Sequence, residues 1–94
     1  MAEEAKATQL VDDDRVRVTR FDFAPGAETG WHVHGCDYVI VALSDCRMKL
    51  DLPGGESAEA RVAAGESYRR EKGVEHNVIN GGKGPMSFVE IELK

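Results

Sequence analysis

The sequence predicts an all-β domain, a sandwich or barrel of about eight short strands. Apolar and polar residues alternate with a period of two in several short segments, and ten glycines interrupt these segments as turns. Almost no segment shows the 3.6-residue period of a helix. Among such folds, the jelly roll closes two antiparallel sheets around an interior that can hold a ligand. We therefore expect a jelly-roll β-barrel.

Two strands are predicted in the first half of the chain. Residues 15–19 alternate cleanly, whereas Phe21 and Phe23 shift the apolar positions by one residue. A β-bulge, or burial on both faces, would explain the shift. Residues 31–43 follow, and they contain the apolar run 39–43, which is long enough for a central strand buried on both faces.

The second half of the chain predicts a series of hairpins. Residues 47–52 alternate, residues 53–56 have the composition of a tight turn, and residues 58–62 return as the partner strand. Three more strands are expected at residues 67–70, 76–80 and 87–94. In the last strand, the residues expected to face the interior are Val89, Ile91 and Leu93.

The length of 94 residues predicts one domain. Residues 1–13 are polar and acidic and are expected to form a flexible N-terminal arm, which leaves residues 14–94 as the folded domain. A chain of this length buries only about 60–65% of its unfolded surface. Its core is therefore small, and because a second copy would stabilise it, we expect a homodimer.

The composition excludes several kinds of partner. A net charge of −5 argues against nucleic acid and against an anionic membrane surface, since both bind clustered Lys and Arg. No apolar run approaches the roughly 20 residues that span a bilayer, and the charged N-terminus does not resemble a secretory signal. We therefore expect a cytoplasmic protein. In that compartment Cys36 and Cys46 are expected to be free thiols.

All three histidines of the chain fall in two predicted strands. His32 and His34 are two residues apart, so their side chains share one face of a strand, and His76 lies in a later strand that could bring it beside them. A single histidine would most simply be an ordinary core or surface residue. Three imidazoles that converge would instead bind a divalent transition metal and leave coordination positions open, as in a catalytic site.

Two segments around these histidines resemble the signatures of the cupin superfamily. Residues 26–34 resemble the first signature, in which a glycine and five residues precede His-x-His. Gly65, Gly73, His76 and Asn80 stand at the spacing of the second signature. The resemblance implies a single cupin domain with a jelly-roll barrel, a homodimer, and a metal bound by the three histidines.

The chain departs from the cupin signatures at three positions. Tyr38 stands where the superfamily has its glutamate ligand, Asp45 replaces the closing glycine of the first signature, and Glu71 replaces the proline of the second. Without the glutamate, three neutral imidazoles would surround the metal. Because no ligand charge would offset the cation, the open positions would favour an anionic guest.

Three-histidine cupins include iron-dependent dioxygenases that cleave β-diketones or oxidise thiols. The resemblance therefore implies a non-haem iron dioxygenase acting on a small chelating anion, such as a β-diketone enolate. Fe(II) is the leading metal, and Zn, Ni, Cu, Co and Mn stay open. The alternatives are a cupin that only binds a small molecule or metal, and a metal-dependent isomerase or lyase.

Tyr38 is the candidate catalytic residue. Its hydroxyl could hydrogen-bond substrate, O₂ or a metal-bound water, or act as an acid or base, while the competing interpretation is that it fills the barrel interior. Cys36 lies on the histidine face and could coordinate the metal as a thiolate, but it is more simply a small buried hydrophobe. Trp31 is expected in the core or at a dimer interface, pointing away from the metal. The charged run 69–72 is expected to be a solvated turn, and the alternative is that one of its arginines faces an anionic substrate. Glu28 lies in the loop before the histidine pair and would be a ligand only if that loop folds back.

Overall fold

The structure, a computed structural model, describes residues 3–94 and is all-β within that range. The strands are β1 (Lys6–Asp12), β2 (Val16–Phe23), β3 (His32–Val33), β4 (Asp37–Ala42), β5 (Cys46–Asp51), β6 (Ser57–Val62), β7 (Ser67–Arg70), β8 (Glu75–Asn80) and β9 (Met86–Leu93). A single 3₁₀ turn, η1 (Pro53–Gly55), joins β5 to β6. No helix in this part of the chain has the length and apolar character needed to cross a membrane.

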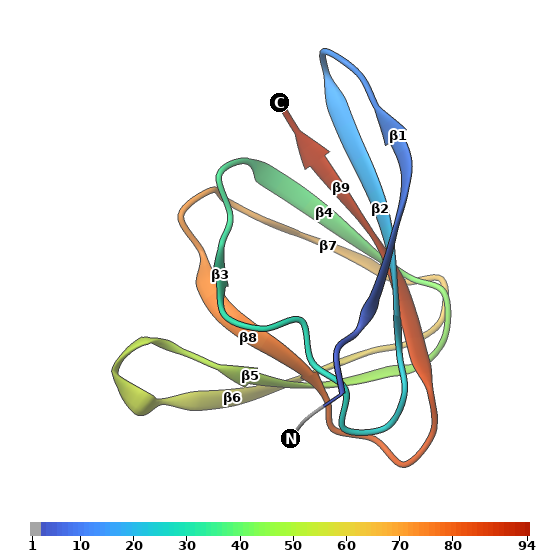
Figure 1. Ribbon diagram of the computed structural model, residues 1–94, viewed down its shortest axis with the longest axis vertical. Helices are drawn as coiled ribbons and strands as arrows, with labels where there is room; N and C mark the ends of the chain where they lie inside the picture. The colour runs from blue at the N-terminus through green and yellow to red at the C-terminus, as the bar shows by residue number, and fades with distance from the viewer. Residues whose placement is uncertain (1–2) are drawn as a thin grey trace.

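The strands form two antiparallel sheets that face each other in a jelly roll (Figure 1). One sheet has the order β1-β2-β9-β4-β7 and the other the order β3-β8-β5-β6. The sheets do not close into the barrel we expected. Among the edge strands, β3 has only two residues and β7 only four, so each offers a short edge for pairing with the other sheet. Residues between the sheets form the core.

The N-terminal segment is not a flexible arm over its whole length. Within residues 1–13, strand β1 pairs with β2, and the register shifts between Gln9 and Val11. All seven residues of β1 are exposed. Because neither face of β1 is buried, its sequence shows no alternation to predict the strand. The prediction for residues 1 and 2 lies outside the described residues.

The pairing of β2 with β9 corrects two expectations about strand faces. It runs without interruption from Val16 opposite Leu93 to Phe23 opposite Met86, so β2 contains no bulge against β9. Phe21 and Phe23 point inward, while Val16 and Val18 lie on the outer face. The last strand likewise faces the interior with Met86, Phe88, Glu90 and Glu92. The expected inward residues of this strand, Val89, Ile91 and Leu93, lie on the outer face instead.

Aromatic rings pack against one another within the five-stranded sheet, and one asparagine ties the two sheets together. The ring centroid of Phe88 lies 5.6 Å from that of Phe21 and 5.4 Å from that of Phe23. Asn80, at the end of β8, donates hydrogen bonds to the carbonyl oxygens of Phe23, Ala24 and Gly84. The asparagine of the second signature therefore ties β8 to the ends of two neighbouring loops, which fixes the strand that carries His76.

Candidate metal centre

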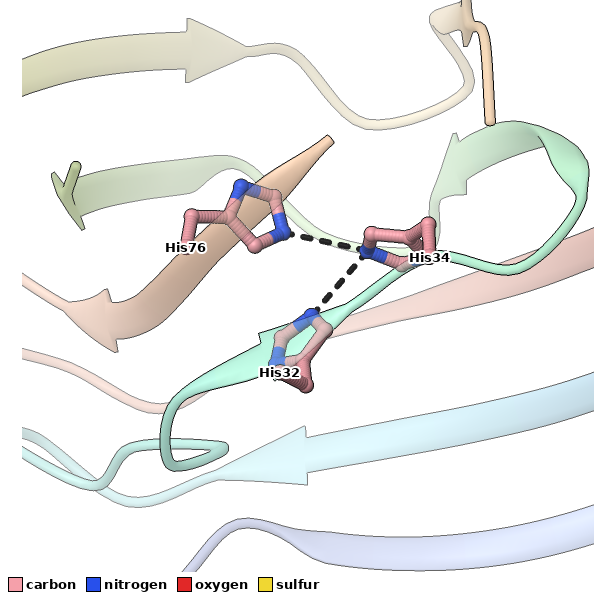
Figure 2. Close-up of side chains that lie close together, drawn as sticks. All are labelled: His32, His34 and His76. Carbon is pink, nitrogen blue, oxygen red and sulfur yellow. Dashed lines mark hydrogen bonds between the residues drawn. The ribbon is translucent and has the colours of Figure 1, made fainter. Parts of the chain in front are cut away.

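The three histidine side chains meet at one point (Figure 2). His32 in β3 stands directly opposite His76 in β8. His34 follows β3, and its backbone pairs with the turn before β8, donating to the Val74 carbonyl and accepting from the Gly73 amide. Gly73 has a φ of +96°, a conformation that favours glycine, so the glycine of the second signature shapes the turn that positions His34.

The separations between ring nitrogens fit a shared metal ion. The Nε2 atom of His34 lies 3.0 Å from Nε2 of His32 and 3.1 Å from Nε2 of His76. With metal–nitrogen bonds of about 2.1 Å, neighbouring ligands lie ~3.0 Å apart at right angles and ~3.4 Å apart in a tetrahedron. The observed separations therefore match right-angle coordination, the arrangement that leaves the most positions open.

The hydrogen bonds of His32 fix its tautomer. Its Nδ1 donates to the Gly30 carbonyl oxygen at 2.9 Å, and because a carbonyl can only accept, Nδ1 carries the proton. The lone pair on Nε2 is then free to bind a metal. Asn77 holds this loop in place by accepting a hydrogen bond from the Gly30 amide at 2.9 Å. Gly30 itself has a φ of +86°, which a side chain would strain.

The other two histidines are neutral at physiological pH. Burial lowers the pKa of His34 to about 4, and nearby His32 and His76 add to the effect. Burial likewise lowers the pKa of His76 to about 4, with smaller contributions from the charges of His32 and Arg70. Because a metal needs the unprotonated nitrogen, this environment prepares both rings as ligands.

Two glutamates beside the centre were missed by the sequence interpretation. The Glu90 carboxylate lies 3.6 Å from Nδ1 of His34, on the side of the ring away from the other histidines. Burial raises the pKa of Glu90 to about 7, and the Glu92 charge adds to it. Glu92 forms an ion pair with Arg17 at 3.2 Å. The alternation of strand faces could have found them. If Met86 is taken as an inward residue, Glu90 and Glu92 fall on the same inward face.

Tyr38 lies against the centre, but its hydroxyl is poorly suited to act as a base. Its ring stacks on the His34 ring with centroids 3.8 Å apart and planes 18° apart, and only 2% of the residue is exposed. Burial raises the pKa of the hydroxyl further above its usual value. Tyr38 therefore orients His34 by packing, and a catalytic role for its hydroxyl stays a prediction.

A cavity of about 310 Å³ opens onto the histidines between the two sheets. This volume suits a small molecule, and the cavity is lined by apolar side chains with a few polar groups, as ligand sites commonly are. The apolar walls come from Phe21, Val33, Ile40, Met48, Val78 and Phe88. The polar groups come from Thr29, the three histidines, Tyr38, Tyr68, Glu90 and Glu92.

The remaining candidates from the sequence lie elsewhere. Trp31 points away from the metal as expected, but it is 50% exposed and its Nε1 donates to Glu75. Glu28 accepts a hydrogen bond from the Asn77 side chain, so it supports the loop before His32. Cys36 is half-buried, and both it and Cys46 are free thiols.

Comparison with known proteins agrees with the fold. Residues 9–92 match the cupin domain family. The chain is 50% identical over 91 residues to the beta-alanine degradation protein BauB of Pseudomonas aeruginosa, covering 97% of this chain and 95% of that protein.

Two solved structures illustrate the range of similar folds. A cupin domain from Bordetella pertussis is 45% identical with a TM-score of 0.95, covering 100% of this chain and 97% of that one. The polyketide cyclase RemF of Streptomyces resistomycificus is 27% identical with a TM-score of 0.71, covering 98% and 68%. From the domain match, the close relative and the jelly roll together, this chain belongs to the cupin family.

Proposed function

We propose that His32, His34 and His76 hold one divalent transition metal and that the protein is a metal-dependent oxygenase acting on a small chelating anion. The observation that carries this proposal is the convergence of the three Nε2 atoms at separations that one ion would impose. Fe(II) is the leading metal, and Zn, Ni, Cu, Co and Mn remain alternatives, because three imidazoles suit all of them.

The charge of the site supports an anionic guest. The three histidines supply no negative charge, and Glu92 is already paired with Arg17 at 3.2 Å. Glu90 also lines the cavity, but burial raises its pKa to about 7, so it carries only part of a negative charge near neutral pH. A bound divalent ion would polarise the oxygens of a chelating substrate and, as Fe(II), could activate O₂ beside it. The protein residues would orient this chemistry. The Gly30 carbonyl fixes the proton of His32, Tyr38 packs on His34, and the apolar walls exclude water.

The name of one relative suggests a narrower substrate class. The Pseudomonas protein is named for the degradation of β-alanine. β-Alanine carries its amino group on the carbon β to its carboxylate. Replacing that amine by an oxo group gives a 3-oxo acid. Such an acid and a β-diketone both present two oxygens in a 1,3 relationship, and both can chelate through a six-membered ring. We therefore propose 3-oxo acids and β-diketones as the substrate class.

Oxygen consumption tests this function. Metal-free protein, prepared without an affinity tag, is reconstituted with Fe(II) and mixed with acetylacetone, acetoacetate or a small thiol. We expect oxygen uptake with a 1,3-dicarbonyl compound, loss of uptake in His34→Ala, and retention of metal in Tyr38→Phe. A product formed without oxygen would support an isomerase or lyase. Tight binding of the dicarbonyls without turnover by any of the metals would support a binding protein.

The outer face of the five-stranded sheet supports a homodimer. This outer apolar face consists of Val11, Val16, Val18, Val39, Val41, Val89, Ile91 and Leu93, which the strand registers place side by side. Of these residues, Val11 is 43% and Leu93 37% exposed. Because contiguous apolar surface of this kind is uncommon on a monomer, we propose that a second copy covers it.

A further inference from the structure

We propose that Arg70 binds the carboxylate of the substrate, so that the protein selects chelating acids over chelators without a carboxylate. This inference rests on the proposed metal site, and it names a residue that would set substrate specificity. The sequence indicates a solvated turn for the charged run 69–72, with an arginine facing an anionic substrate as the alternative. In the structure its two arginines have different surroundings.

Arg70 is an exposed residue at the end of β7, on the same face of the strand as the cavity-lining Tyr68. It stands opposite Tyr38 in the pairing of β7 with β4, and Tyr68 stands opposite Ile40. Tyr38, Ile40 and Tyr68 all line the cavity. The guanidinium carbon of Arg70 lies 4.8 Å from the centre of the Tyr68 ring, a cation–π distance that holds the charge over a wall of the cavity.

The guanidinium of Arg70 is available to a ligand. Within residues 3–94 it donates one hydrogen bond, from Nη1 to the carbonyl oxygen of Arg69 at 3.3 Å, although a guanidinium has five donors. Arg69, by contrast, points to the outside and pairs with Asp37 at 3.1 Å. Of the arginines that form no ion pair within residues 3–94, Arg70 alone shares a strand face with a cavity-lining residue, Tyr68.

The charge of Arg70 is felt by two residues of the site. Burial lowers the pKa of His76 most, His32 contributes next, and the charge of Arg70 lowers this pKa further. Burial raises the pKa of Tyr38, and Arg70 acts in the opposite direction. The two glutamates that line the cavity have partners other than Arg70. Glu92 pairs with Arg17, and Glu90 faces His34. Arg70 therefore supplies a positive charge without an ion-pair partner beside Tyr68, whereas the carboxylates that line the cavity are Glu90 and Glu92.

A 3-oxo acid has the groups that this arrangement requires. Its oxo oxygen and one carboxylate oxygen can chelate a metal, which leaves the second carboxylate oxygen for a guanidinium. The enolate of acetylacetone forms a chelate ring of the same size but has no further oxygen to offer. The two ligands therefore differ in the one feature that Arg70 would recognise.

Ligand binding to cobalt-loaded protein tests the inference without relying on turnover. Acetoacetate and acetylacetone are titrated separately while the visible absorption of Co(II) is followed. We expect Arg70→Gln to weaken acetoacetate binding about tenfold, as for loss of a partly exposed charged hydrogen bond. Binding of acetylacetone should change less than about twofold, since no contact is lost. Arg70→Lys should recover part of the loss, because lysine keeps the charge but lacks the paired N–H donors of a guanidinium.

Arg69→Gln is the matched control, because it removes the neighbouring arginine from the outer face and should leave both ligands unaffected. If Arg70→Gln weakens both ligands equally or neither, the inference is overturned while the proposed function stands. If wild-type protein binds cobalt but neither ligand, the proposed substrate class fails, and the inference fails with it. Circular dichroism of each variant checks that the fold is retained.

Discussion

Replacing Glu90 by glutamine should weaken metal binding and stabilise the metal-free protein. The Glu90 carboxylate lies 3.6 Å from Nδ1 of His34, and its side chain is only 12% exposed. When Nε2 of His34 binds a metal, the ring acquires positive charge and its Nδ1 proton faces this carboxylate. Partners of this kind orient the histidine and raise its basicity as a ligand. Glutamine keeps the shape of Glu90 and removes its charge.

The expected magnitude follows from this distance. Two unit charges 3.6 Å apart interact by about 4.6 kcal/mol at an effective dielectric constant of ~20. A ring that acquires roughly a third of a charge would gain ~1.5 kcal/mol, or about tenfold in metal affinity. This agrees with losses of about 10–100-fold seen when such partners are removed.

The metal-free protein should respond in the opposite direction. Burial raises the pKa of Glu90 to about 7, so above that pH the folded protein carries a buried carboxylate that the unfolded chain would hydrate. Glutamine removes this cost, and at pH 8 the free energy of unfolding should rise by up to ~3 kcal/mol. A glutamate that merely packed in the core would not produce two effects of opposite sign.

Calorimetric titration with Co(II) and urea unfolding of the metal-free protein measure the two effects. Glu92→Gln is the control, because the Glu92 carboxylate is neutralised by Arg17, and its metal affinity should change less than about threefold. Unchanged metal affinity in Glu90→Gln, or a less stable metal-free protein at pH 8, would refute the positioning role.

Three further predictions concern pH, the histidine loop and the dimer. Between pH 4.5 and 6.5, His34 and His76 are protonated in the unfolded chain but not in the folded protein. Glu90 is protonated in the folded protein but not in the unfolded chain, so the unfolded chain binds one proton more. The stability of the metal-free protein should therefore rise by up to ~1.4 kcal/mol per pH unit in urea unfolding, and about twice as steeply in Glu90→Gln; a flat profile would contradict these pKa shifts. Asn77→Ala removes the acceptor of the Gly30 amide and should lower stability by about 1–3 kcal/mol and weaken metal binding, whereas an unchanged melting temperature would argue against this clamp. Ile91→Glu on the outer apolar face should yield monomers in sedimentation experiments on a protein that is otherwise dimeric, and a monomeric wild type would reject the dimer.

The fold class and the three histidines could be predicted because both depend on local patterns in the sequence. Alternation and glycine turns indicate strands, and two histidines two residues apart must share a strand face. The free thiols of Cys36 and Cys46 also agree with expectation. The open edges of the sheets could not be predicted, because closure depends on the lengths of β3 and β7 and on how their ladders end.

The remaining misses concern strands whose two faces look alike in the sequence. In β9 the apolar Val89 and Ile91 face outward while the charged Glu90 faces inward, so hydrophobicity alone assigns the wrong face. A strand that places carboxylates inside and apolar residues outside reverses the usual pattern. The clamp by Asn77 was missed for a different reason. It joins residues 47 positions apart, and only the folded pairing of β3 with β8 brings them together.

Metal binding by wild-type protein and by single histidine variants tests the central claim most directly. Metal-free protein, produced without a tag, is titrated with Co(II), and the bound ion is located by anomalous scattering in a crystal. We expect one ion per chain, bonded to Nε2 of His32, His34 and His76, and an affinity at least ~100-fold lower in His34→Ala. An ion bound elsewhere, or His34→Ala binding cobalt as tightly as wild type, would contradict the account.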